Sequence, residues 1–438
     1  MGKKIVKILF LMLIIFGFAS GIYIAINKNN TEKQDSIKID KVFGNLQSRS
    51  AIVTNVFTYG DTLNVTGTLS NISKENFENA KLILTDGENE ITCNIEVNIE
   101  EKVLNFETSQ INKAIELDSL DIGKYYVLLR LKLNNSASAK YYTLSNASDC
   151  KDIEYYTITR NSENNKIDIQ FLSREYGEKE YKYLAVNVNK AENTDEIYDF
   201  VIDAGHGGQD SGEKLNGHTE ANITLDYAKD LKGRLEELGL KVKLTRDNDN
   251  SSSYTYTNMY DDDGRISIAC KAKAKYMLSF HVNNGNNGLS GLEIYAPCKS
   301  DLKFAKTMAE KVVSSGANTY SNNTGFKKSE GVYVWTFTKA MIKDTVATAN
   351  KKGYEPYNIT TDTPYQYTIR EVGGIGTNAY ADGRNTAYSP NKYYNSNQGI
   401  ECYQIELGYI KNDLEKILYN REAYITSLVQ AIQEYLGL

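Results

Sequence analysis

Residues 200–239 read FVIDAGHGGQDSGEKLNGHTEANITLDYAKDLKGRLEELG, and they give the clearest indication of fold class in the C-terminal part of the chain. It starts with an apolar run at 200–202, continues through a loop of small and polar residues, and ends in a segment with apolar residues at helical spacing. Those apolar residues are Ile223, Tyr227, Leu231, Leu235 and Leu238. Gly239 follows them, as glycine commonly follows the last turn of a helix. The stretch therefore predicts a strand, a loop and an amphipathic helix in succession.

The same alternation continues towards the C-terminus. Three further segments have the pattern of strands: LKVKLTR (240–246), YMLSFHV (276–282) and GLEIYA (291–296). Helical patterns lie at 265–274 and at 420–438. Because strands that alternate with amphipathic helices are typical of α/β domains, we predict such a domain over residues 196–438, with a mostly parallel sheet flanked by helices. Residues at about 298–400 are predicted to form a long insert in this domain. Within it, LKFAKTMAEKVVSSG (302–316) has the pattern of a helix, and the residues that follow show weak periodicity.

Residues 41–195 have a different pattern, with short alternating segments separated by turn residues. Examples are TLNVTGTLS (62–70), KLILTDG (81–87), KYYVLLRLKL (124–133) and KIDIQFL (166–172). Runs of β-branched and aromatic residues at this spacing predict a small, immunoglobulin-like β-sandwich. The segment contains no histidine and no clustered motif. We therefore expect a spacer or a binding module, whose ligand the sequence does not identify.

The N-terminus carries an uncharged apolar run, residues 8–26, directly after a stretch with three lysines. The run is long enough to span a bilayer as a helix, and the lysines should stay in the cytoplasm. The small residues at 16–21 also suit a cleaved secretory signal. We predict that residues 1–28 are a transmembrane anchor or a signal and that residues 29–40 are a linker. Both alternatives place the rest of the chain outside the cytoplasm.

The composition argues against two classes of function. The 438 residues carry a net charge of −6, whereas a protein whose main partner is nucleic acid needs a basic face. The five cysteines show no CxxC spacing, which argues against a four-cysteine zinc site and against a thioredoxin-like redox motif.

Two of the three histidines follow predicted strands. His206 lies in the glycine-rich loop after the first strand, and His281 lies at the end of the strand at 276–282. In an open α/β sheet such positions meet at one edge, where glycines let a ligand approach the backbone closely. The pair indicates a candidate metal site, although a histidine beside a strand also serves as an ordinary hydrogen-bonding group.

Two glutamates extend this candidate site. Glu220 opens the predicted helix, where the helix dipole favours a carboxylate in any case. A His-Glu-His set with one open position matches a catalytic zinc site, and His218 is an alternative ligand that local spacing leaves open. Glu406 lies in the strand-like segment CYQIEL, either as a charged residue at a solvated edge or as the base that a metal hydrolase needs.

Five motifs occur in order along the C-terminal part of the chain. They are VIDAGHGGQDSG (201–212), Glu220, KLTR ending in Arg246 with Arg265 beyond it, SFHVN (279–283) and IELGYIKN (405–412). Together they resemble the zinc-dependent N-acetylmuramoyl-L-alanine amidases of the amidase 3 family, and the resemblance covers residues 198–438. It implies that His206, Glu220 and His281 bind Zn²⁺ and that Glu406 is the catalytic acid and base.

Spacing within the family bears on the open alternatives. The separation of 14 residues between His206 and Glu220 resembles that of the family, and it favours Glu220 over His218 as the ligand. The segment between His281 and Glu406 is longer than in compact members of the family.

Substrate contacts are expected at the site and in the long insert. We predict Asn283, Tyr380 and Arg384 as substrate-binding residues. Arg370 and Asp382 lie in the same insert. These side chains either contact the acidic stem peptide or the glycan, or they form ion pairs that only stabilise the insert.

The resemblance implies a reaction and a location. The expected reaction is hydrolysis of the amide bond between N-acetylmuramic acid and L-alanine in peptidoglycan, with Zn²⁺ as cofactor. The expected partners are peptidoglycan and the membrane that holds the N-terminal helix, with no nucleic acid, and protein partners are not identified. The alternatives are a zinc peptidase that cuts within the stem peptide and a non-catalytic scaffold that binds the cell wall.

Overall fold

The computed structural model describes the chain in several stretches. They are 40–108, 114–134, 136–147, 150–158, 164–192, 196–250, 259–285, 288–298, 300–353, 359–373 and 399–438. The predicted anchor or signal and nearly all of the predicted linker lie outside these residues. Within the described stretches, no helix is both long enough and apolar enough to cross a membrane.

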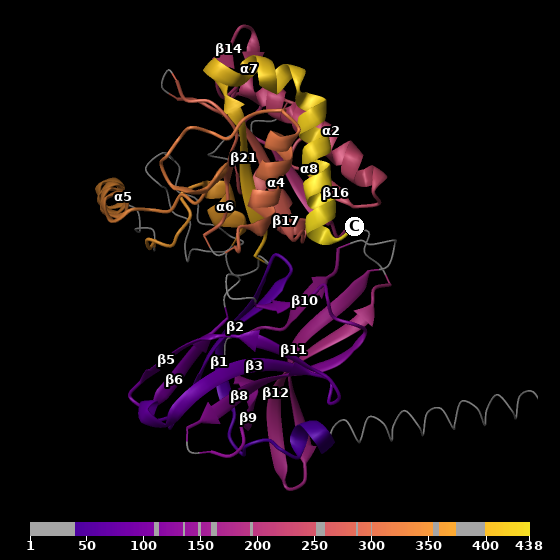
Figure 1. The fold of residues 1–438 in the computed structure, drawn as a ribbon, viewed down its shortest axis with the longest axis vertical. Helices are drawn as coiled ribbons and strands as arrows, with labels where there is room; N and C mark the ends of the chain where they lie inside the picture. The colour runs from indigo at the N-terminus through magenta and orange to yellow at the C-terminus, as the bar shows by residue number, and fades with distance from the viewer. Residues whose placement is uncertain are drawn as a thin grey trace, which may run out of the picture.

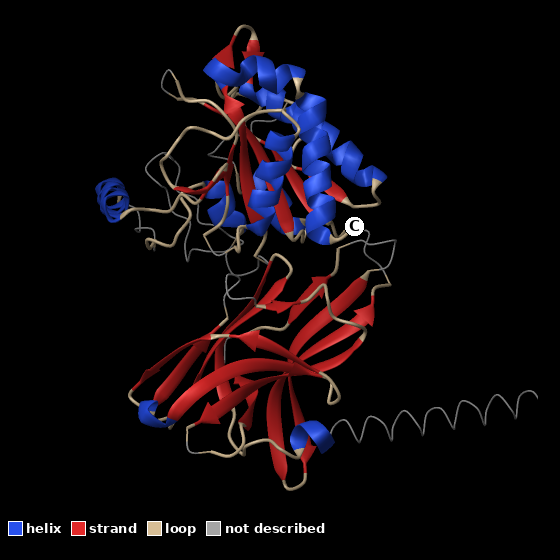
Figure 2. Cartoon of the chain, viewed as in Figure 1, coloured by secondary structure: helices blue, strands red, loops and turns tan. Residues whose placement is uncertain are grey.

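Strands β1 to β12 form the N-terminal part of the structure, the lower half of Figures 1 and 2. Their bounds are β1 Ala51–Tyr59, β2 Thr62–Leu69, β3 Phe77–Thr85, β4 Glu90–Asn94, β5 Glu96–Glu100, β6 Val103–Glu107, β7 Ile115–Glu116, β8 Gly123–Leu133, β9 Lys140–Asn146, β10 Ile153–Tyr156, β11 Asn165–Tyr176 and β12 Lys179–Lys190. They pair in the order β10-β11-β12-β8-β9-β1-β2-β6-β5, with β3 added at β8, β4 at β3 and β7 at β2.

Strand β9 joins two groups of strands in this N-terminal part. One group contains β3, β4, β8 and β10 to β12, and the other contains β1, β2 and β5 to β7. β9 pairs with β8 on one side and with β1 on the other, so the strands form one hydrogen-bonded path. Leu63 and Leu104 from one group share a buried cluster with Leu82 and Val186 from the other. The path therefore folds over a core that both groups of strands share, as packed sheets do. The segment is β-rich as predicted, but the two layers expected of a sandwich are joined by β9.

Strands β13 and β16 to β21 form a second sheet, in the upper half of Figure 1. Their bounds are β13 Phe200–Ala204, β16 Val242–Leu244, β17 Tyr276–Asn283, β18 Glu293–Tyr295, β19 Lys327–Ser329, β20 Val332–Tyr333 and β21 Glu401–Tyr409. The order is β16-β13-β17-β21-β18-β20-β19. The first four strands are parallel, whereas β18 runs antiparallel to β21 and β19 antiparallel to β20. The mostly parallel sheet is confirmed, and its last three strands make it mixed.

Helices cover both faces of the mixed sheet. Their bounds are α2 Glu220–Glu237, α3 Arg265–Lys271, α4 Lys303–Ser314, α5 Lys339–Lys352, α6 Tyr367–Val372, α7 Ile410–Tyr419 and α8 Arg421–Leu436. Because successive residues of a strand point to opposite faces, β13 contributes Ile202 to one core and Val201 to another. Ile202 clusters with residues of α2, α4, α7 and α8, and Val201 clusters with residues of α3 and α6.

Helix α2 agrees with the sequence prediction except at Leu238, the last residue of the predicted apolar stripe. The Thr219 hydroxyl accepts a hydrogen bond from the backbone N–H of Asn222 and so caps the helix. The predicted apolar stripe is buried at Ile223, Tyr227, Leu231 and Leu235. Leu238 does not continue the stripe and is 39% exposed, because the helix ends at Glu237 and Leu238 is its C-cap.

The predicted insert contains more regular structure than its weak periodicity indicates. Helix α4 confirms the helical pattern at 302–316, and helices α5 and α6 and strands β19 and β20 lie in the weakly periodic residues up to 373. Strand β20 pairs with β18, so part of the insert extends the central sheet. Residues 374–398 lie outside the described part of the chain.

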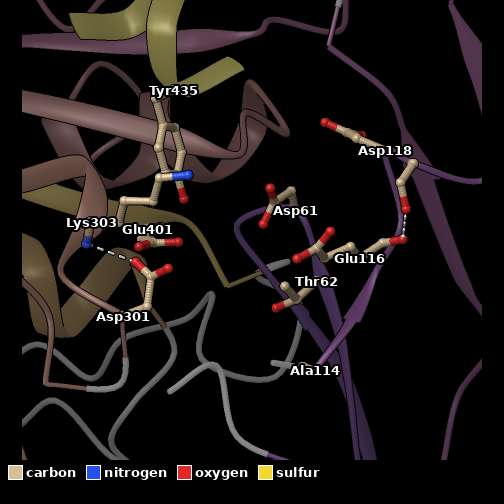
Figure 3. A pocket seen from close by; sticks show the side chains of 10 residues that line it. Asp61, Thr62, Ala114, Glu116, Asp118, Asp301, Lys303, Glu401 and Tyr435 are labelled. Carbon is tan, nitrogen blue, oxygen red and sulfur yellow. Dashed lines mark hydrogen bonds between the residues drawn. The ribbon is translucent and has the colours of Figure 1, made fainter. Parts of the chain in front are cut away.

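The β-rich part contacts the amino end of the parallel strands. In the turn between β1 and β2, the backbone N–H of Gly60 donates to the carbonyl of Gly399, just before β21. A side chain at Gly399 would lie 2.1 Å from the carbonyl oxygen of Thr58, so this close approach requires glycine. A cavity of about 370 Å³ opens beside the contact (Figure 3). Its charged lining consists of Asp61, Glu116 and Asp118 from the β-rich part and Asp301, Lys303 and Glu401 from the α/β part.

Candidate metal centre

Three side chains converge at the carboxyl edge of the mixed sheet. His206 comes from the loop after β13, Glu220 from the first residue of α2, and His281 from β17. One ligand atom from each residue lies within 4.8 Å of those of the other two. Glu220 Oε1 is 3.1 Å from His206 Nε2 and 3.2 Å from His281 Nδ1. The sequence therefore folds so that two imidazoles and one carboxylate, separated by up to 75 residues, face one point.

Electrostatics keep the carboxylate of Glu220 ionised. Burial alone would raise its pKa, but hydrogen bonds with His206 and His281 hold the pKa well below its usual value. The backbone N–H groups of Val282 and Glu213 also donate to this carboxylate, at 2.8 and 3.0 Å. Glu220 therefore offers an anionic oxygen beside two imidazole nitrogens.

Two buried arginines hold the loop that carries His206. Arg265 donates to the carbonyl of His206 at 2.9 Å, and Arg246 donates to the carbonyls of Ala204 and Gly205 at 2.9 and 3.1 Å. His206 itself has a left-handed backbone with φ of +59°, a conformation that few residues other than glycine adopt. The arginine contacts stabilise this turn and direct the imidazole towards Glu220.

Asp203 connects the same loop to the neighbouring strands. Its carboxylate is fully buried and accepts hydrogen bonds from Ser279 at 2.6 Å, Thr245 at 2.7 Å and Arg265 at 2.8 Å. Burial opposes ionisation, but Arg265 and the two hydroxyls lower the pKa of Asp203 below its usual value. These hydrogen bonds thus fix β13 relative to the adjacent strand β17, which carries His281.

Two glycines of the loop lie directly against the converging side chains. A Cβ at Gly205 would lie 2.6 Å from His281 Nε2, and a Cβ at Gly212 would lie 2.5 Å from Glu220 Oε2. Gly212 also has a positive φ of +60°. The glycines predicted to leave room for a ligand therefore lie where any side chain would enter the site.

The donor set fits a metal ion such as Zn²⁺. His281 Nε2 is buried and has no hydrogen-bond partner among the described residues, which is unusual for a buried polar atom. His206 Nδ1 lies 2.9 Å from Asp210 Oδ2, an arrangement that orients many metal-binding histidines. Two imidazoles and one carboxylate are the protein ligands of many catalytic zinc sites.

Glu406 lies beside this group on the adjacent strand. It pairs with His281 in the register of β17 and β21, and its side chain is 7% exposed. Burial raises the pKa of Glu406 to about 7, an effect that His281 partly opposes. Gln404 Nε2 donates to Glu406 Oε1 at 2.8 Å. A carboxyl group that exchanges a proton near neutral pH is suited to acid and base catalysis.

The remaining predicted residues have different positions. Asn283 ends β17 and donates to Glu293 Oε2 at 3.0 Å. His218 is exposed in the short hairpin of β14 (Lys214–Leu215) and β15 (His218–Thr219), and it is not part of the converging group. Arg370 is buried in α6 and pairs with Glu371 at 2.9 Å, as a residue that only stabilises the insert would. Tyr380, Asp382 and Arg384 lie outside the described residues.

Sequence reasoning missed one buried carboxylate at the site. Glu293 on β18 is fully buried and lies opposite Glu406 in the register of β18 and β21. The signal was present in the predicted strand GLEIYA, where one charged residue interrupts an apolar segment. A buried charge is costly without partners, so its presence indicates a specific use.

A family model for N-acetylmuramoyl-L-alanine amidase, the amidase 3 type, matches residues 200–437, more than half of the chain. The chain belongs to this amidase family. The resemblance drawn from the five motifs is thereby confirmed, and the matched residues include all four residues of the candidate site.

Individual relatives match parts of this amidase-family chain. The N-acetylmuramoyl-L-alanine amidase LytC of Bacillus subtilis (strain 168) is 31% identical over 139 residues, covering 32% of this chain and 26% of LytC. The endolysin of Bacillus phage SPP1 is 35% identical over 113 residues, covering 26% of this chain and 38% of the endolysin. The N-acetylmuramoyl-L-alanine amidase AmiC2 of Nostoc punctiforme has a TM-score of 0.32 at 21% identity, covering 56% of this chain and 100% of the AmiC2 chain. The chain spans 26% to 63% of the length of the curated relatives it matches.

Proposed function

We propose that this chain hydrolyses the amide bond between N-acetylmuramic acid and the L-alanine of the stem peptide in peptidoglycan. The observation that carries the proposal is the convergence of His206, Glu220 and His281, with Glu406 on the adjacent strand. Membership of the amidase family supports the same reaction.

His206, Glu220 and His281 would hold the metal ion, for which we propose Zn²⁺. A zinc ion bound there supplies Lewis-acid chemistry, which polarises a carbonyl group and makes water more acidic. Asp210 orients the imidazole of His206 through its contact with Nδ1. Arg265 and Arg246 keep the loop in the conformation that directs this imidazole to Glu220.

Glu406 would move the proton during the reaction. As a carboxylate it accepts a proton from the attacking water at a side-chain oxygen, and it then donates that proton to the nitrogen of the departing L-alanine. The bond that breaks joins the lactyl carbonyl carbon to this nitrogen, and the bond that forms joins the same carbon to the water oxygen. Burial of Glu406 excludes competing solvent from its side chain.

The location and the domain organisation are part of the proposal. We propose that residues 1–28 anchor the chain in the membrane or are cleaved as a signal, and that 29–40 form a linker. The immunoglobulin-like β-rich segment 41–195 and the catalytic domain 196–438, with its insert at about 298–400, would then act on peptidoglycan outside the cytoplasm. Asn283, Tyr380 and Arg384 are the proposed substrate contacts.

Digestion of purified peptidoglycan tests the reaction directly. Mass spectrometry should find stem peptides with a free N-terminal L-alanine and glycan chains that remain intact. The Glu406→Gln variant should release no such stem peptides. Glu237→Gln, a matched change at the exposed end of α2, should behave as the wild type. Cleavage within the stem peptide would instead identify a peptidase. Zinc content without any product, unchanged by Glu406→Gln, would identify a scaffold.

A further inference from the structure

Four hydrogen-bond donors converge on the buried carboxylate of Glu293. Oε2 accepts from Asn283 Nδ2 at 3.0 Å and from the Tyr295 hydroxyl at 2.7 Å. Oε1 accepts from the Ser321 hydroxyl at 2.7 Å and from the Tyr409 hydroxyl at 2.5 Å. Each oxygen therefore accepts two hydrogen bonds, which uses all the acceptor positions of a carboxylate.

This carboxylate belongs to the edge of the sheet where the candidate metal centre lies. Glu293 pairs with Glu406 across β18 and β21, and Glu406 pairs with His281 across β21 and β17. Residues directly opposite on paired strands project from the same face of a sheet. Glu293, Glu406 and His281 thus form one row across three strands.

The hydrogen-bond partners of Glu293 among the described residues are all uncharged. Within the described residues, no lysine or arginine forms an ion pair with it, and its partners are hydroxyl and amide groups. Burial of a carboxylate without a cation costs free energy that hydrogen bonds offset only in part. The four hydrogen bonds therefore offset part of the cost of burying this carboxylate, and they also hold the groups that donate them.

One of these hydrogen bonds determines the orientation of the Asn283 side chain. A carboxylate with filled acceptor positions only accepts hydrogen bonds, so the Asn283 amide must direct its NH₂ group towards Glu293. Its carbonyl oxygen, Oδ1, then points the other way and accepts no hydrogen bond within the described part of the chain. Asn283 is partly exposed and lies two residues after His281, at the end of the same strand.

We propose that Glu293 is a positioning residue, which fixes the Asn283 amide so that Oδ1 accepts a hydrogen bond from a backbone N–H of the stem peptide. The proposal rests on the proposed amidase function, because it assigns the peptide side of that substrate to Asn283. Glu293 itself does not touch the substrate. It removes the alternative amide orientation, in which an NH₂ group would face the peptide N–H and repel it.

Substitution of Glu293 by glutamine tests this orientation. In Glu293→Gln the side chain can donate as well as accept, so Asn283 can reverse and present its NH₂ group to the substrate. We expect the dissociation constant of a soluble N-acetylmuramoyl tripeptide to rise about tenfold, the size of one lost hydrogen bond. Calorimetry on the full zinc-loaded chain carrying Glu406→Gln measures this binding without cleavage. In the chain with Glu406 intact, KM should rise similarly while kcat changes little.

An exchange of the two side chains distinguishes orientation from stability. In the double variant Asn283→Asp with Glu293→Gln, the amide at 293 donates to the carboxylate at 283, whose second oxygen again faces the substrate as an acceptor. Binding should recover to within about threefold of the background chain, whereas Asn283→Asp alone should bind weakly because two carboxylates then face each other. Glu371→Gln provides a matched buried control, which should lower the unfolding midpoint without changing the dissociation constant.

The outcomes separate this inference from the proposed function. Unchanged tripeptide binding by Glu293→Gln, or an exchange variant that binds no better than the weaker single variant, overturns the positioning role. The expected binding pattern in a chain that releases no N-terminal L-alanine overturns the amidase function and keeps the role of Glu293. Absence of tripeptide binding by the background chain counts against both.

Discussion

The guanidinium of Arg265 lies 2.8 Å from the carboxylate of Asp203, and neither side chain is more than 2% exposed. Arg265 also donates to the carbonyl of His206, so one buried ion pair connects the end of β13 with the loop that carries a candidate metal ligand. The pair therefore links the stability of the fold to the geometry of the site.

Removal of the arginine should affect both properties. Arg265→Met leaves Asp203 buried without its cation, and we expect a loss of about 3–5 kcal/mol in the free energy of unfolding. Urea denaturation of the full chain measures this loss, and zinc titration of the folded fraction should show weaker binding because His206 loses its backbone support. The exposed pair of Arg234 and Glu422 is the control, and Arg234→Met should cost no more than about 1 kcal/mol.

Metal removal should destabilise the folded chain. A ligand that binds only the folded state adds about 4 kcal/mol of stability at a concentration 1,000 times its dissociation constant. Dialysis against a zinc chelator should therefore lower the thermal midpoint and abolish hydrolysis, and added Zn²⁺ should restore both. His206→Ala and His281→Ala should behave as the chelated protein, whereas His218→Ala should retain zinc. Loss of zinc from His218→Ala would instead favour His218 as a ligand.

Asp210 should tune metal affinity without binding the metal. Its carboxylate lies 2.9 Å from His206 Nδ1, and substitution of such outer partners commonly weakens metal binding 10- to 100-fold. We expect Asp210→Ala to raise the zinc dissociation constant within about this range while the folded structure persists. Competition with a chromophoric chelator measures the constant, and an unchanged value would show that the arginine contacts alone orient His206.

Local patterns in the sequence predicted the elements that carry the candidate site. The strand, loop and helix at 200–239 follow the prediction because apolar periodicity reports directly which face of an element is buried. Leu238 departs from it, since the end of a helix depends on cap geometry that periodicity does not contain. The antiparallel direction of β18 was not predicted, because it depends on the path of the connection between β17 and β18, and the alternation of strands and helices does not report that path.

Contacts between distant segments explain the parts of the site that the sequence left open. His218 and Glu220 are both close to His206 in sequence, and the hairpin of β14 and β15 turns His218 to the surface while Glu220 begins α2. Glu293 receives its hydrogen bonds from residues as far away as Tyr409, 116 positions along the chain. No local pattern reports such partners, so a charged residue in an apolar strand was the only signal of its role.

The contact between the β-rich part and the α/β part should respond to pH through Asp61. Burial, together with the nearby Asp118, raises the pKa of Asp61 to about 6 from a usual value of 3.8, and Lys275 only partly opposes this. The folded state therefore binds the proton more tightly than the unfolded chain does, so stability is fully present below about pH 4 and is lost as pH rises through 6. The loss amounts to about 3 kcal/mol, since each pKa unit corresponds to about 1.4 kcal/mol.

Asp61→Asn should consequently stabilise the chain at pH 8 and have little effect at pH 4 in urea denaturation, while the exposed control Asp121→Asn should change neither value. Equal effects of Asp61→Asn at both pH values would contradict this assignment.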